Sequence, residues 1–137
     1  LYPMDVYVVV GQNSVANIQA GVYHYEPGKH QLSVVSNGDM RSAVARASLF
    51  QMWMAKAPIT IVITAEYERA TGKYGKRGIQ YALIEAGHIG QNIFLQAQAL
   101  GLEAGIVGAF RDAELIDAMN VPTAREPVLL MSVGYPA

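Results

Sequence analysis

The stretch GIQYALIEAGHIGQNIFLQAQAL (residues 78–100) is the longest helical pattern in the chain and decides how the other elements can pack around it. Apolar residues recur on two sides of the expected helix. One side is marked by Ile79, Leu83, Ala86, Ile93, Ala97 and Leu100, and the other by Tyr81, Ile84, His88, Gln91, Leu95 and Ala99. A helix that is apolar on two sides is expected to be buried on two sides. Gly101 is a natural C-cap for it.

The polar residues of the same helix include Glu85, His88, Gln91 and Asn92. Buried polar groups need hydrogen-bond partners. We therefore expect a network that ties the helix to a neighbouring subunit or to strand ends. A catalytic role for His88 is the alternative.

Strands and helices interleave on either side of this helix. β-Branched and aromatic runs predict strands at 5–10, 59–64, 102–107 and 127–133, and a hairpin formed by 21–25 and 31–35. Further helices are predicted at 40–48, with Asp39 as N-cap, at 112–119, and within 66–76 as a short helix followed by a loop. This order predicts a three-layer α+β or α/β domain around a mixed sheet, and 137 residues fit a single domain, 1–137.

The composition narrows the classes of function. Hydrophobic residues make up 52% of the chain and charged residues 15%, so the apolar surplus calls for a partner subunit. The net charge of −1 gives no sign of nucleic-acid binding. The sequence contains no run of about 18 uncharged apolar residues, the length that a membrane-spanning helix needs. The absence of cysteine fits a reducing compartment, so we expect the cytoplasm, and the scattered histidines His24, His30 and His88 predict no metal site.

Three local patterns could carry chemistry. The small residues of 105–110, at a strand end, would let a ligand ring approach the backbone; a plain glycine turn is the alternative, and spacing alone favours it. Gln51 offers a donor and an acceptor that match the imide edge of a uracil-like ring, or it caps a helix end. Lys73 and Tyr74 could transfer a proton to or from a substrate, or they lie in a solvated loop.

Short motifs also follow one another in a specific order along the whole chain. They are Leu1-Tyr2-Pro3 with Val6-Tyr7-Val8, Gly21-Val22-Tyr23-His24-Tyr25, Gln51 with Ala57-Pro58, Lys73-Tyr74-Gly75 with Arg77-Gly78, Tyr81-Ala82-Leu83 with Glu85-Ala86-Gly87-His88, Gln91-Asn92, Leu100-Gly101-Leu102 and Val107-Gly108-Ala109-Phe110. The series resembles the nitroreductase-like flavin family, in the SagB-type branch that includes the azoline oxidases.

The resemblance implies a three-layer α/β/α fold of the α+β class around a mixed, mainly antiparallel sheet, built as an intertwined homodimer with FMN at the subunit interface. It implies that Val107, Gly108 and Ala109 lie against the flavin, and that Gln51 meets its pyrimidine edge. Lys73 and Tyr74 match a pair implicated in azoline oxidation. The family's phosphate-holding segment would lie before Leu1, so we expect this stretch alone to bind FMN weakly or not at all.

The resemblance thus predicts an FMN-dependent oxidoreductase that works by hydride transfer through flavin N5. One variant is a reductase of nitro or quinone compounds driven by NAD(P)H. The other is a dehydrogenase of a small organic molecule or a peptide heterocycle. The alternative to both is a non-catalytic dimeric module that sequesters flavin or binds a protein.

Overall fold

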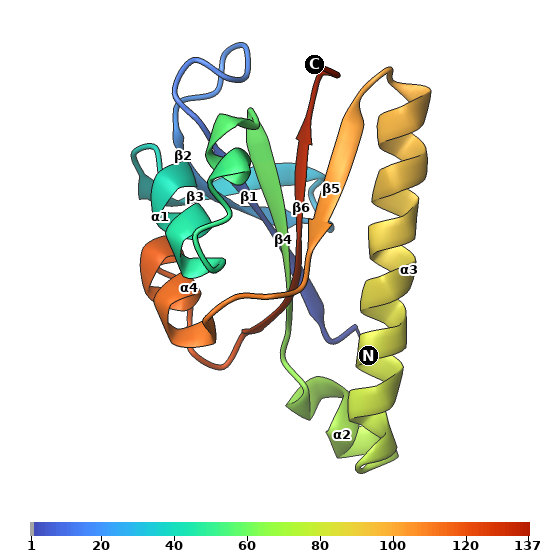
Figure 1. Ribbon diagram of the computed structural model, residues 1–137. Coiled ribbons are helices and arrows are strands. Elements are labelled where there is room, and N and C mark those ends of the chain that lie inside the picture. Colours follow the sequence, from blue (N-terminus) through green and yellow to red (C-terminus); the bar gives the residue numbers. More distant parts are fainter. Residues whose placement is uncertain (1) are drawn as a thin grey trace.

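The computed structural model describes residues 2–137, so Leu1 of the first motif lies outside the described residues (Figure 1). The elements along the chain are β1 (Met4–Val10), β2 (Gly21–Glu26), β3 (Gln31–Asn37), α1 (Arg41–Ala47), the 3₁₀ helix η1 (Met52–Lys56), β4 (Ile59–Ala65), α2 (Glu68–Tyr74), α3 (Arg77–Ala99), β5 (Glu103–Val107), α4 (Asp112–Met119) and β6 (Glu126–Gly134). The predicted elements are all present. The loop expected before the long helix is reduced to Gly75 and Lys76.

The six strands form one sheet in the order β3-β2-β1-β4-β6-β5. Every strand pairing within residues 2–137 is antiparallel. The α+β class is thereby confirmed. The predicted mixed sheet is fully antiparallel within the described residues, with no parallel pair of strands. β1, β4 and β6 are the central strands, and their β-branched residues place side chains alternately on the two faces.

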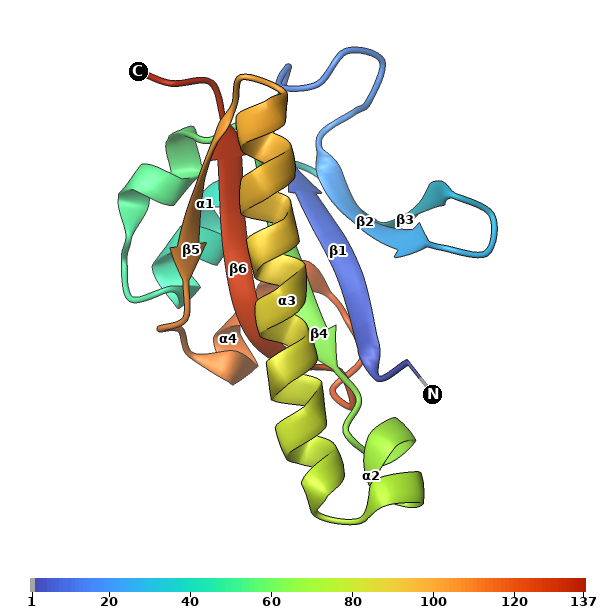
Figure 2. The same ribbon diagram turned by 90° about the vertical axis from the view of Figure 1, so that its right-hand side faces the viewer.

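Helices cover both faces of this sheet, which confirms the three-layer architecture (Figures 1 and 2). On one face Val62 of β4 and Leu130 of β6 pack with residues of α1, η1 and α4. On the other face Ile63 and Met131, the next residues along the same strands, pack with Ala82 and Ala86 of α3. Alternation along β4 and β6 therefore builds two separate cores, one for each face. No helix within residues 2–137 is long and apolar enough to cross a membrane.

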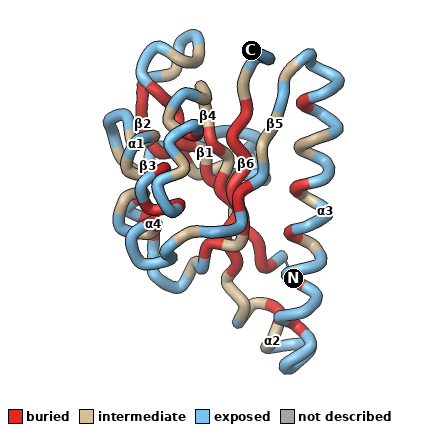
Figure 3. The backbone as a smooth tube through the Cα atoms, in the orientation of Figure 1, coloured by how far each residue is buried: buried red, intermediate tan, exposed pale blue. Residues whose placement is uncertain are grey.

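One side of α3 packs closely on the sheet (Figure 3). Its buried residues are all small: Gly78, Ala82, Ala86, Gly90 and Ala97. Short side chains let the helix axis approach the sheet. Three of the larger apolar residues, Leu83, Ile84 and Leu95, point away from the sheet and are 47%, 50% and 60% exposed. Within the single chain the sheet therefore covers only one side of α3, and burial of the other side by a partner subunit stays a prediction.

The polar residues of α3 do not form the expected network within the chain. His88, Gln91 and Asn92 are exposed, and Glu85 is half-buried. They lie on the sides of the helix that the sheet leaves uncovered, so water can satisfy them without a protein partner.

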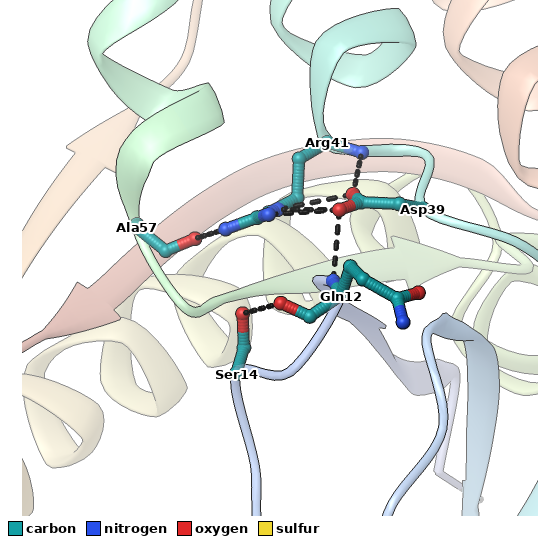
Figure 4. Close-up of polar contacts among 5 residues, drawn as sticks. All are labelled: Gln12, Ser14, Asp39, Arg41 and Ala57. Carbon is teal, nitrogen blue, oxygen red and sulfur yellow. Dashed lines mark hydrogen bonds and ion pairs between the residues drawn. The ribbon is translucent and has the colours of Figure 1, made fainter.

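The start of α1 differs by one residue from the prediction. The helix begins at Arg41 with Met40 at the N-cap position, rather than with Asp39 there. The Asp39 carboxylate accepts the Arg41 backbone N–H at 3.2 Å, the Arg41 guanidinium at 2.8 Å and the Gln12 backbone N–H at 2.8 Å (Figure 4). The guanidinium also donates to the Ala57 carbonyl at 3.1 Å. Asp39, Arg41, Gln12 and Ala57 form what we call the Asp39–Arg41 clamp.

The clamp joins three parts of the fold. It links the loop after β1, the start of α1 and the residue that follows η1. Gly11 makes this possible, because a Cβ there would lie only 2.1 Å from the Arg41 guanidinium. The Arg41 hydrogen bonds hold the pKa of the Asp39 carboxyl at about 2, below its usual 3.8.

Candidate functional site

The loop after β5 has the geometry of a surface open to a ligand. Val107 is the last residue of β5 and is buried, whereas Gly108 and Ala109 are exposed. A Cβ added at Gly108 would meet nothing within 4 Å. Within residues 2–137 the backbone N–H groups of Gly108 and Ala109 donate no hydrogen bond, although the Arg111 N–H donates to the Ala47 carbonyl at 2.8 Å. The loop therefore presents free donors beside open space.

Gln51 lies directly beside this loop. Its carboxamide NH₂ donates to the Ser48 carbonyl at 2.8 Å and to the Ala109 carbonyl at 3.4 Å. Two predicted site residues, Gln51 and Ala109, which are 58 positions apart in sequence, are thus brought together. Because the NH₂ group is used by the protein, the carboxamide oxygen is the group that Gln51 can offer to a ligand, and it accepts an N–H.

The residues before Gln51 are held in an unusual backbone conformation. Leu49 and Phe50 have φ of 56° and 57°, in the left-handed region that bulky residues rarely adopt. Strain of this kind concentrates at functional sites. Leu49, Phe50, Met52 and Trp53 are all large apolar residues with exposed side chains, and we call them the 49–53 patch. The patch surrounds Gln51 in sequence, so a substantial apolar surface adjoins the Gly108 loop.

A different glycine of the predicted loop serves a packing role. A Cβ at Gly105 would lie 2.8 Å from the Trp53 indole, so the absence of a side chain at Gly105 leaves room for that ring. The open approach expected for the whole 105–110 segment is therefore confined to Gly108 and Ala109. Trp53 in turn holds η1, and hence Gln51, against β5.

Lys73 and Tyr74 lie elsewhere, at the end of α2. The Lys73 Nζ is 5.2 Å from the centre of the Tyr74 ring, and the Tyr74 ring meets the Tyr81 ring edge-on with 5.4 Å between centroids. A cavity of about 330 Å³ adjoins them, lined by Pro3, Ala70, Tyr74, Tyr81, Ala82 and Glu85. Figures 1 and 2 both place α2 beyond one end of the sheet, apart from the loop that follows β5. One chain therefore does not bring this pair to Gln51 and Gly108.

Sequence reasoning missed a charged cluster around Asp5, whose side chain is only 12% exposed. Its carboxylate meets His24 Nε2 at 3.1 Å, an Arg69 guanidinium nitrogen at 3.0 Å and Arg125 Nε at 3.5 Å. Arg125 also donates to the hydroxyl of the buried Tyr7, and burial raises the pKa of that phenol. The sequence feature that could have revealed this cluster is Asp5 itself, a single acidic residue at the start of the apolar strand predicted at 5–10.

Comparison with known proteins supports the fold and the sequence resemblance. The model of the nitroreductase family matches residues 1–135. A Methanocaldococcus jannaschii protein provisionally named a nitroreductase, MJ1384, is 41% identical over 97% of this chain and 65% of its own length. The Escherichia coli microcin B17-processing protein McbC is 31% identical over 88% of this chain and 46% of its own length.

A solved structure agrees with these sequence matches. A chain of the E. coli microcin synthetase McbBCD complex with truncated pro-MccB17 superposes with a TM-score of 0.88 and 28% identity, over 99% of this chain and 53% of that one. The chain thus spans between about half and two thirds of these relatives. Because the family model covers nearly all of the sequence, and because the fold superposes closely on a solved relative, the chain belongs to the nitroreductase family.

Proposed function

We propose that the chain is the flavin-binding part of an FMN-dependent oxidoreductase, with the flavin ring against Gly108 and Ala109. The convergence of Gln51 on the open, donor-bearing loop at Gly108 is the observation that carries this proposal. When bound, FMN would supply the capacity to accept and return a hydride. The chain would supply the place, the orientation and the electrostatics.

The residues of the loop fit a planar ring with one polar edge. The free N–H groups of Gly108 and Ala109 can stabilise negative charge that develops on a bound ring, because preorganised donors need no reorganisation. The Gln51 carboxamide oxygen can accept the imide N–H of the pyrimidine edge. The apolar 49–53 patch would exclude water from the neighbouring surface.

We further propose that two copies form a homodimer and that the site is completed across the interface. The exposed apolar side of α3 and the 49–53 patch are surfaces that a second copy would cover. Lys73 and Tyr74 of the partner copy would then reach the flavin site, which they do not reach within one chain. The cytoplasm and a small-molecule substrate remain parts of this proposal, as does an NAD(P)H donor for the reductive reaction.

The reaction that we favour is dehydrogenation of a heterocycle in a peptide or small organic substrate. A relative is named for processing microcin B17, and a solved relative belongs to a complex that has truncated pro-MccB17 bound. Dehydrogenation removes a proton and a hydride from the substrate. Lys73 with Tyr74 can receive the proton, while the hydride would pass to bound FMN and from there to an external electron acceptor that reoxidises it. Reduction of nitro or quinone compounds driven by NAD(P)H is the other reaction that this site could support.

Binding of FMN and riboflavin to the purified chain tests the flavin site. We expect flavin absorbance and quenched flavin fluorescence, and we expect Gly108→Val to weaken both because its side chain fills the open space. Gly28→Val is the matched control, since the space around Gly28 is equally open but lies in the β2–β3 turn. A folded wild-type chain that takes up neither flavin would contradict the proposal and support the non-catalytic module.

Mixed dimers test the completion of the site by the partner. Lys73→Ala and Gly108→Val are each expected to abolish turnover in a homodimer. A heterodimer of the two variants keeps one intact site if Lys73 acts across the interface, because both lesions then fall in the same site. If Lys73 acts within its own chain, every site carries one lesion and the heterodimer stays inactive, which would refute this part of the proposal.

A further inference from the structure

The Asp5 cluster lies between the sheet and the short helix that carries Lys73 and Tyr74. Asp5 is on β1, Arg69 is in the first turn of α2, and their side chains meet at 3.0 Å. Arg69 also pairs with Glu66, which precedes the helix, and the Glu66 backbone N–H donates to the Pro3 carbonyl at 2.8 Å. The first turn of α2 is thus fastened to the start of β1 by one ion pair and one backbone hydrogen bond.

The other end of α2 is fixed by close packing against α3. Gly75 ends α2 with φ of 61°, which lets the chain reverse at once into α3. A Cβ on Gly78 would lie 2.7 Å from the backbone of Ala70 and Thr71, so the two helices are in backbone contact there. This contact sets the distance of α2 from α3 but does not by itself set its rotation about its own axis.

The ion pair between Arg69 and Asp5 further restricts the rotation of α2. Arg69 and Lys73 are four residues apart, so they lie on the same side of the helix, one turn from each other. Holding Arg69 on Asp5 therefore fixes the direction in which Lys73 leaves the helix. Tyr74 is then held next to Lys73 by its edge-on contact with Tyr81, whose hydroxyl accepts a hydrogen bond from Arg77 Nε at 3.2 Å.

We propose that Asp5 and Arg69 are positioning residues that set the orientation of Lys73 and Tyr74, an inference that rests on the proposed role of this pair in proton transfer. Asp5 is well suited to the task, because its nearly buried carboxylate holds Arg69 in a site with little competing water. It also contacts His24 of β2 and Arg125 of the segment before β6, neither of which belongs to α2.

Two arginine variants separate positioning from general stabilisation. Arg69→Gln and Arg125→Gln each remove one arginine from Asp5, but only Arg69 belongs to α2. In the FMN-loaded full chain, we expect Arg69→Gln to lower kcat by about tenfold or more, with KM and FMN affinity nearly unchanged. We expect Arg69→Lys to restore part of that loss, and Arg125→Gln to leave kcat within about twofold of wild type.

Hydrogen exchange gives a readout that does not need turnover or flavin. The Thr71 and Gly75 amides of α2 donate within the helix and its cap at 2.8 Å each. We expect these amides to exchange faster in Arg69→Gln than in Arg125→Gln, with Asp117→Asn, an exposed carboxylate on α4, behaving as wild type. If the wild type shows neither flavin binding nor turnover, the proposed function fails, while the exchange data still decide whether Asp5 and Arg69 hold α2.

Two results would overturn the inference. One is equal α2 exchange in the two arginine variants. The other is a fall in kcat for Arg69→Gln that Arg69→Lys does not relieve and that Arg125→Gln reproduces, because the cluster would then act on stability alone. Asp5→Glu, which keeps the charge, gives a second conservative comparison if either glutamine variant fails to fold.

Discussion

Asp39→Asn removes the charge of the Asp39–Arg41 clamp while keeping the shape of the side chain. An asparagine oxygen can still accept one of the two backbone N–H groups, from Gln12 or from Arg41, but the NH₂ group replaces the second acceptor and no charge is left for the guanidinium. The clamp connects the loop after β1 with α1 and with Ala57, directly after η1, so its loss also loosens the segment that carries Gln51. We expect a chain that folds but is less stable than wild type at neutral pH.

The size of the effect follows from the pKa of the carboxyl. A fall from 3.8 to about 2 in the folded state corresponds to at most about 2.5 kcal/mol, at about 1.4 kcal/mol for each pKa unit. The Asp39 side chain is 28% exposed, so solvent screening reduces the expected value to about 1–2 kcal/mol. Because the folded-state pKa is lowered, this stabilisation is complete above pH 3.8 and disappears as the pH falls through about 2.

Urea unfolding followed by circular dichroism, at one protein concentration and at several pH values, measures the effect. The difference in free energy of unfolding between wild type and Asp39→Asn should be constant from pH 7 to pH 5 and should shrink toward zero near pH 2. Asp117→Asn, which removes an exposed carboxylate, should show little difference at any pH. A difference that is absent at pH 7, or that persists undiminished at pH 2, would refute the assignment to the charge of Asp39.

Other consequences of the packing can be measured directly. Gly105→Ala places a Cβ 2.8 Å from Trp53, so the fluorescence emission of this single tryptophan should shift to longer wavelength. Gly28→Ala is the control and should leave the spectrum unchanged. An unchanged spectrum for Gly105→Ala would show that the indole does not pack on β5. Ala86→Leu enlarges a side chain that is 1% exposed between α3 and the sheet, so the free energy of unfolding should fall by about 1–3 kcal/mol in urea titrations; a value equal to wild type would mean that α3 can move away freely. Leu95→Glu places a charge on the uncovered side of α3, where Leu95 is 60% exposed, so light scattering should show a monomer with an unchanged circular dichroism spectrum; a dimer of undiminished stability would exclude this side of the helix from the interface.

The strands could be predicted because their residues are strongly β-branched and each is bounded by turn residues. The runs at 59–64 and 127–133 have little freedom to form anything else, and they are found as β4 and β6. The start of α1 was displaced because the Asp39 carboxylate is engaged by Arg41 and by Gln12, which is 27 residues away. Local rules for helix caps do not contain that long-range contact.

The candidate site was predicted unevenly for a similar reason. Gln51 and Ala109 were each proposed to contact one ligand, and the structure brings them together. The packing of Trp53 on Gly105 could not be foreseen, since the two residues become neighbours only when η1 folds over β5. The apolar sides of α3 were recognised, but a pattern of apolar residues does not tell whether the cover is the chain's own sheet or another surface.

The order of the strands places β3 at one rim of the sheet. Its seven residues, QLSVVSN, include neither a charged residue nor a proline. Edge strands commonly contain such residues, because they hinder pairing with strands of other chains. The Leu32 and Val34 side chains are also exposed on this strand. The edge strand β3 can therefore pair with a strand of another chain and promote aggregation, independently of the exposed side of α3. Val34→Lys would oppose this pairing without disturbing either core.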